Sequence, residues 1–118
     1  MEPGKIRIDR CEEKLNITRF NNVLDDNFVK DNQDKYDIVT LFHVLEHVID
    51  PVKFVENCLK IIKKDGLIYI EVPNNNCDLV EYGNYYRDNI WYMKSHISYF
   101  SPDILKLILN KNNINEFE

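Results

Sequence analysis

The clearest hydrophobic pattern in this sequence is a run of β-branched and aromatic side chains at residues 36–42, where apolar and polar positions do not alternate. Such a run predicts a strand that is covered on both faces. Asp50 and Pro51 predict the start of a helix, because an Asp side chain caps a first turn and proline fits its first position. Gly66 is expected to end that helix in the left-handed conformation, and residues 67–72 predict a second buried strand.

The order strand, helix, strand predicts a βαβ unit with a right-handed crossover, and therefore two parallel strands in an α/β fold. A last helix is predicted after Ser101 and Pro102, which repeat the capping signal. Its inward positions are expected to be Ile104, Leu105, Ile108 and Leu109.

The segments outside this unit are less regular. Apolar side chains at Ile8, Cys11 and Leu15 predict a short amphipathic helix, and the residues that follow, 17–20, predict a short strand. The charged stretch at 25–37 predicts a solvated loop. The aromatic stretch at 76–101 is interpreted as a lid or acceptor pocket, with an ordinary hydrophobic cover over the sheet edge as the alternative.

Length, composition and charge narrow the class of protein. The 118 residues are 44% hydrophobic and fit one small domain, 1–118. Lys and Arg number 15 and Asp and Glu 20, and the net charge of -5 argues against a nucleic-acid partner or an anionic membrane surface. No apolar run reaches the roughly 18 to 20 residues of a membrane span. The three cysteines form no C-x-x-C pair, which indicates free thiols in a reducing compartment and predicts a cytoplasmic protein.

The densest group of chemically versatile side chains is the corner His43-Val44-Leu45-Glu46-His47, directly after the first predicted strand. The second predicted strand ends similarly, in Glu71-Val72-Pro73-Asn74. Because ligands bind beyond the carboxyl ends of parallel strands, we expect both strand ends to face one crevice.

Three interpretations of this corner compete. It matches the H-x-x-E-H pattern of zinc peptidases, but that site needs a long helix, and Asp50-Pro51 starts a new helix only three residues after His47. In a purely structural interpretation, Glu46 and His47 brace the corner by local hydrogen bonds. In the third interpretation the corner is the edge of an active site.

Residues 36–74, YDIVTLFHVLEHVIDPVKFVENCLKIIKKDGLIYIEVPN, resemble the central part of class I S-adenosylmethionine-dependent methyltransferases. The resemblance rests on VLEH, on the DP that follows, and on a helix and a strand that ends in PN. It extends to His96-Ile97-Ser98-Tyr99-Phe100-Ser101 downstream and to Met1-Glu2-Pro3 upstream. It implies a partial Rossmann-like parallel sheet with flanking helices. It also implies methyl transfer to an oxygen, nitrogen or carbon atom of a small molecule, such as a sugar- or quinone-like acceptor.

The same resemblance implies S-adenosylmethionine as the cofactor and assigns residues to it. Glu2 matches the acidic residue that binds the two ribose hydroxyls, for which a carboxylate offers two acceptor oxygens. Leu24 and Asp25 fall near the loop that flanks the adenine. Phe42 and His43 lie where the family lines the methionine side of the cofactor.

The catalytic candidates are Glu46, His47 and His96. His47 is the expected general base, because an unperturbed imidazole titrates near neutral pH, and Glu46 can orient it. His96 is expected to join them from the far side of the crevice. A mixed nitrogen and oxygen metal site made of His43, Glu46, His47 and His96 is an alternative use of the same side chains. We expect no metal in the site.

The sequence departs from the family in its glycines. It has three, Gly4, Gly66 and Gly83, and none of them belongs to the glycine-rich loop that wraps the cofactor in class I methyltransferases. The chain is therefore interpreted as an interior fragment, and a non-catalytic truncated methyltransferase unable to bind the cofactor is the alternative function. The strand at 36–42 is expected to have an open edge, which is either covered by residues 17–23 or paired with another chain in a homo-oligomer.

Overall fold

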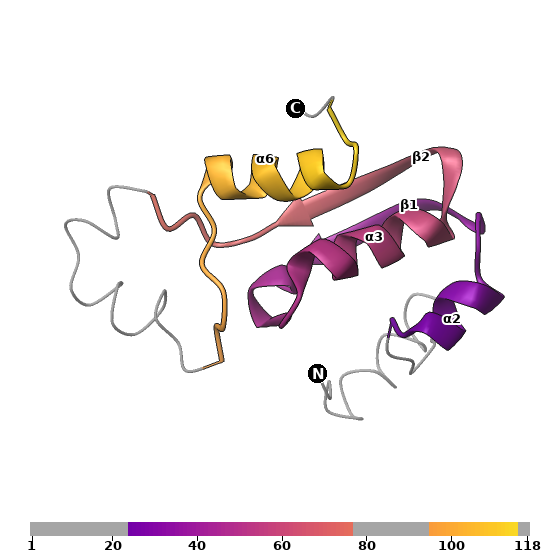
Figure 1. Cartoon of the computed structure of the whole chain (residues 1–118), viewed down its shortest axis with the longest axis horizontal. Coiled ribbons are helices and arrows are strands. Elements are labelled where there is room, and N and C mark those ends of the chain that lie inside the picture. The colour runs from indigo at the N-terminus through magenta and orange to yellow at the C-terminus, as the bar shows by residue number, and fades with distance from the viewer. Residues whose placement is uncertain (1–23, 77–94, 116–118) are drawn as a thin grey trace, which may run out of the picture.

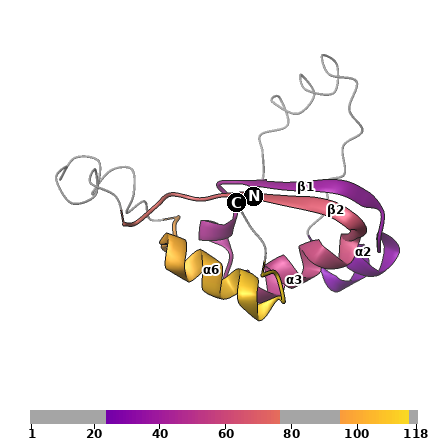
Figure 2. The ribbon, with the colours of Figure 1, turned by 90° about the horizontal axis from the view of Figure 1, so that it is seen from above.

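The computed structural model describes residues 24–76 and 95–115. Its elements are α2 (Asp26–Asp31), β1 (Tyr36–Phe42), the 3₁₀ turn η1 (Leu45–His47), α3 (Pro51–Ile61), β2 (Ile62–Glu71) and α6 (Pro102–Lys111). The two strands lie side by side, and Figure 2 shows α3 and α6 on the same side of them (Figures 1 and 2). The described part is thus a sheet covered by one layer of helices, which agrees with the predicted α/β class.

Several predictions concern residues outside these ranges. They are the helix with Ile8, Cys11 and Leu15, the strand at 17–20, the ribose-binding Glu2 and most of the aromatic stretch at 76–101. The single-domain assignment for 1–118 likewise stays a prediction.

The strands β1 and β2 are parallel, as the βαβ order predicts. Their register places Ile38 opposite Leu67 and Phe42 opposite Glu71, so both strands end at the same edge of the sheet. The prediction that both faces are covered is wrong. The face turned away from the helices exposes about half or more of four large side chains, Ile38, Phe42, Leu67 and Tyr69. Within the described residues the helices cover only the other face, so the uninterrupted apolar run misled the prediction.

The helix α3 begins as predicted, with the Asp50 side chain accepting a hydrogen bond from the Lys53 main-chain N–H at 2.9 Å. It ends at Ile61, however, and Gly66 does not terminate it but lies inside β2 without a positive φ. A Cβ atom at Gly66 would collide with the Ile62 side chain and lie 2.7 Å from the main-chain oxygen of Asp37 in β1. The glycine therefore permits a close approach between the strands rather than a left-handed turn.

The charged stretch at 25–37 is not only a loop, because it contains α2. Asp25 caps this helix, its Oδ1 accepting a hydrogen bond from the Phe28 N–H at 2.8 Å, and Val29 is buried. This helix has six residues and one buried side chain, so it is too short for hydrophobic periodicity to predict it.

The helix α6 begins after Ser101, as predicted, and buries Ile108 and Leu109. Ile104 was expected to point inward and is instead nearly half exposed. The core that α6 helps to form consists of Leu41, Leu45, Val55, Cys58, Phe100 and Ile108.

Cys58 is a free, buried thiol in this core. Burial raises the pKa of the thiol to about 12, so the thiolate that a nucleophile or metal ligand requires is not formed near neutral pH. Cys58 is therefore a small core residue, as its isolated position in the sequence suggests. No helix within the described ranges is long and apolar enough to cross a bilayer.

Candidate functional site

The corner between β1 and α3 is short. The turn η1 is a single 3₁₀ turn, closed by a 3.0 Å hydrogen bond from the His47 N–H to the Val44 main-chain oxygen, with Leu45 fully buried beneath it. His43 precedes the turn and has a φ of 51°, in the left-handed region. The two histidines of H-x-x-E-H therefore do not share a continuous helix, and the zinc-peptidase interpretation is not supported.

The segment at 95–100 docks against this corner and brings His96 to it. The main-chain N–H groups of residues 97 and 98 donate to the Glu46 main-chain oxygen at 2.9 and 3.1 Å. The rings of His96 and His47 lie edge to face, with their centroids 5.0 Å apart. Two segments far apart in the sequence thus share one small site.

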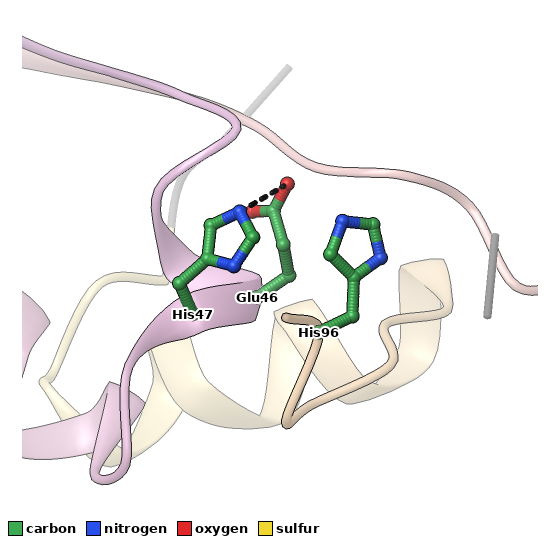
Figure 3. A group of neighbouring side chains, drawn as sticks. All are labelled: Glu46, His47 and His96. Atoms are coloured by element: carbon green, nitrogen blue, oxygen red, sulfur yellow. Dashed lines mark ion pairs between the residues drawn. The ribbon is translucent and has the colours of Figure 1, made fainter. Parts of the chain in front are cut away.

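The three catalytic candidates meet in this site. Figure 3 shows the side chains of Glu46, His47 and His96 gathered together, and one nitrogen or oxygen atom from each lies within 4.8 Å of the others. The Glu46 side chain is only 2% exposed, yet neither of its oxygens has a hydrogen-bond partner among the described residues. Desolvating a carboxylate without a hydrogen bond is unfavourable, so this group is available to a donor or a cation.

The hydrogen bond of His47 determines which ring nitrogen can accept a proton. Its Nδ1 lies 2.7 Å from the main-chain oxygen of Ser95, and because a carbonyl oxygen only accepts, Nδ1 must carry the hydrogen. In the neutral ring, Nε2 is then the atom with the free electron pair. It faces Glu46 Oε1 at 4.0 Å.

His43 contacts the same carboxylate oxygen of Glu46 that faces His47. Its Nδ1 is 3.4 Å from Glu46 Oε1, and its Nε2 is 3.2 Å from Glu71 Oε1 at the end of β2. Tyr69 donates its hydroxyl to Glu71 Oε2 at 3.1 Å, and this hydrogen bond together with the negative charge of Glu71 raises the pKa of the phenol. A line of contacts therefore runs from the buried carboxylate to the exposed end of the sheet.

The candidates for cofactor binding are more dispersed. Phe42 is exposed on the open face of the sheet, where its ring packs against Tyr69 with the centroids 5.1 Å apart. Leu24 is half-buried against the core, and the Asp25 carboxylate already serves as the cap of α2. Five residues were predicted to bind the cofactor. Among those that the structure describes, only Phe42 and His43 lie at the strand ends.

Two polar contributions to the site were not predicted. Glu71 was placed at the end of the second strand but was given no role, although its place at the carboxyl end of a parallel strand was a usable signal. The main-chain oxygen of Ser95, which orients His47, carries no signal in the sequence. Its approach depends on a contact between residues 48 positions apart.

A separate groove of about 750 Å³ runs between β2 and α6. It is lined mainly by apolar side chains, among them Leu59, Ile68, Leu105 and Leu109. No residue of the corner at 43–47 lines it, although Tyr69, which donates to Glu71, does.

Comparisons with known proteins agree with this fold. Residues 6–115 match the family model described as a methyltransferase domain. A ubiquinone biosynthesis O-methyltransferase of Neisseria meningitidis is 31% identical over an alignment of 81 residues, which covers 58% of this chain and 34% of that protein. A protein of the same name from Vibrio campbellii is 29% identical over 76 residues, or 64% of this chain and 32% of its own length. The chain thus spans about a third of these curated relatives.

A solved structure shows the same likeness in three dimensions. The crystal structure of a SAM-dependent methyltransferase from Archaeoglobus fulgidus aligns with a TM-score of 0.65 and 27% identity, over 92% of this chain and 47% of that one. The family match covers most of the chain. The VLEH sequence forms the corner between β1 and α3, as the family resemblance implied. The chain therefore belongs to the methyltransferase domain family, with the α/β fold of the class I S-adenosylmethionine-dependent methyltransferases.

Proposed function

We propose that this chain transfers a methyl group from S-adenosylmethionine to an oxygen, nitrogen or carbon atom of a small molecule. The observation that carries the proposal is the cluster of Glu46, His47 and His96 beside the carboxyl ends of two parallel strands. Such strand ends are where open α/β sheets bind ligands. The family match supports the reaction type.

The described residues supply the groups that handle a proton. The cofactor, when bound, supplies a methyl group already activated as a sulfonium. His47 takes the acceptor proton at Nε2, and the Glu46 carboxylate at 4.0 Å stabilises the imidazolium that forms. The ring of His96 borders the same space and helps to orient the acceptor. A positioned base of this kind contributes a rate factor of roughly 10² to 10⁴.

The fit to the cofactor is partial within the described ranges. Phe42 offers an exposed aromatic face at the end of β1, where the methionine side of the cofactor is expected. The Asp25 carboxylate already accepts a hydrogen bond from its own helix, which makes it a weaker candidate. Glu2, Leu24 and His43 complete the set of predicted cofactor contacts.

The acceptor we favour is a quinone-like or phenolic molecule, with a sugar as the alternative. The relatives named as ubiquinone biosynthesis O-methyltransferases support it. A phenolic hydroxyl also suits the site, because Glu46 and His47 Nε2 both accept hydrogen bonds and a hydroxyl can donate one. The net charge of -5 favours a small molecule over nucleic acid as partner.

The proposal is tested by comparing three purified chains: the wild type, His47→Asn and Ile49→Ala. Each is incubated with S-adenosylmethionine and panels of phenols, sugars and amines, and S-adenosylhomocysteine formation is measured. Ile49 is the matched control because it lies two residues from His47 and is 93% exposed. We expect turnover on a phenol, a loss of roughly 10² to 10⁴ in the His47→Asn variant, and no loss in the control.

The alternative function is a truncated methyltransferase that keeps the fold and does not bind the cofactor. Calorimetric titration of the folded chain with S-adenosylhomocysteine separates the two. Binding tighter than about 100 μM supports the enzyme. A folded chain that releases no heat supports the alternative and refutes the proposed activity for this chain.

We also propose that the chain forms homo-oligomers through its sheet. β1 pairs only with β2 among the described strands, and the open face exposes Ile38 and Leu67. Exposed strand edges and apolar faces favour association. Sedimentation at several concentrations tests this, and a monomer at all of them contradicts it.

We further propose a cytoplasmic location, which the free thiol of Cys58 supports.

A further inference from the structure

We propose that His43 is a positioning residue, whose ring bridges the buried Glu46 carboxylate to Glu71 and holds Glu46 beside His47. This inference deepens the proposed function and rests on it for its catalytic meaning. The resemblance assigns His43 to the cofactor, whereas the geometry points to a role in the proton-accepting pair.

The first argument is the placement of the ring. Both nitrogens of His43 face a carboxylate oxygen, Glu46 Oε1 at 3.4 Å and Glu71 Oε1 at 3.2 Å. A neutral imidazole has a single N–H, so one of these contacts would place a lone pair against a negative oxygen. Both contacts are favourable when the ring carries a hydrogen on each nitrogen.

The second argument is the position of Glu46. Its side chain is buried and has no hydrogen bond among the described residues, so the neighbouring histidine rings are its sources of positive charge. His47 cannot fill this role before it accepts a proton, because its one ring hydrogen points to Ser95. His43 Nδ1 is also nearer to Glu46 Oε1 than His47 Nε2 is, at 3.4 Å against 4.0 Å, so the His43 ring is placed to hold the buried carboxylate.

The third argument is the backbone of His43, whose φ of 51° lies in the left-handed region. A non-glycine residue there is under mild strain, and such strain collects at functional sites. The conformation turns the chain sharply at the end of β1, while the His43 N–H still donates to the Glu71 main-chain oxygen at 3.0 Å. Main chain and ring thus both tie the corner to the end of β2.

The test is a double-mutant cycle on the full chain, with urea unfolding as the measurement. Its variants are His43→Asn, Glu46→Gln and the pair together. Asparagine tolerates a positive φ, so it removes the ring without adding backbone strain. We expect Glu46→Gln to increase the unfolding equilibrium constant when His43 is present. In the His43→Asn background it should decrease that constant, because the carboxylate it removes is there unpaired. The coupling should be about tenfold at pH 7.

Repeating the cycle at pH 9 separates charge from packing. A coupling that comes from charge should fall there to within about twofold, whereas a coupling due to packing would persist. Glu71→Gln should couple to His43→Asn in the same sense, and Glu56→Gln is the control because Glu56 pairs with Lys53 and Lys60 on α3. Additive effects at pH 7, or an undiminished coupling at pH 9, would overturn the inference.

A kinetic measurement distinguishes this inference from the proposed function. If the wild type transfers methyl groups, His43→Asn should lower kcat about tenfold or more, with little change in the KM for S-adenosylmethionine. A rise in that KM alone would assign His43 to the cofactor and overturn the inference. A wild type without activity would refute the proposed function for this chain, while the unfolding cycle would still decide the role of His43.

Discussion

Replacing Gly66 by alanine tests how closely β1 and β2 approach each other. A Cβ atom at this position would collide with the Ile62 side chain and lie 2.7 Å from the Asp37 main-chain oxygen and 3.1 Å from that of Lys63. Two of these three neighbours are main-chain atoms of the paired strands, which cannot move aside as the end of a flexible side chain would. We therefore expect the methyl group to push the strands apart.

The size of the effect follows from two opposing terms. Forcing a methyl group into a filled space costs about 1 to 3 kcal/mol, and the main-chain neighbours place Gly66 in the upper half of that range. The alanine recovers about 0.5 to 1 kcal/mol, because glycine loses more chain entropy in a strand. The net loss in the free energy of unfolding is about 1 to 2.5 kcal/mol, which lowers Tm by about 4 to 10 °C.

Thermal unfolding followed by circular dichroism measures this difference. Lys64→Ala is the matched control, since Lys64 is an exposed residue of the same strand and its truncation should leave Tm nearly unchanged. An unchanged or higher Tm for Gly66→Ala would mean that the strands do not approach as closely as the structure shows.

Three further predictions concern the core and the surface. Leu45→Ala should lower the free energy of unfolding by about 2 to 5 kcal/mol in urea titrations, because Leu45 is fully buried; a loss below about 1 kcal/mol would contradict this. In a chain with serine at positions 11 and 77, Cys58 should resist alkylation at pH 8 until urea is added, since burial raises the pKa of its thiol to about 12. Rapid labelling of the folded chain would refute this. The Lys63 side chain lowers the pKa of Asp37, so Asp37→Asn should be slightly less stable than the wild type at neutral pH, with a difference that vanishes as the pH falls below about 4. A difference that persists in acid would contradict the assignment.

The starts of the helices could be predicted because their signals are local. Asp50 and Ser101 each cap a helix by accepting a hydrogen bond from a main-chain N–H three residues ahead, and a proline follows each of them. The parallel pairing of the strands also followed from local order, through the preference for right-handed crossovers. The end of α3 could not be found in this way. Gly66 has its role because Asp37 of the other strand lies close to it, and the sequence contains no sign of that contact.

The candidate site shows the same division. The position of the corner was predicted from the order of strand and helix, and it lies at the edge that the parallel register defines. The approach of His96 was expected from the family resemblance and not from any pattern in the residues. Glu71 reaches His43 only because the register places the end of β2 opposite the end of β1. The contacts between the side chains depend on such distant pairings.

The purely structural interpretation of the corner makes a requirement that these contacts do not meet. It needs Glu46 and His47 to brace the turn by local hydrogen bonds, but the Glu46 carboxylate makes none within the described residues and the His47 ring binds Ser95, 48 positions away. Asp50 already caps the helix that follows. An apolar side chain of similar size would stabilise this turn at least as well as a buried carboxylate, because replacing a buried charge by a hydrophobic group is often neutral or favourable. His43 has a positive φ, and Glu46 is a buried carboxylate without a hydrogen bond among the described residues. Two such unfavourable features in one turn are typical of residues held in place for chemistry rather than for stability.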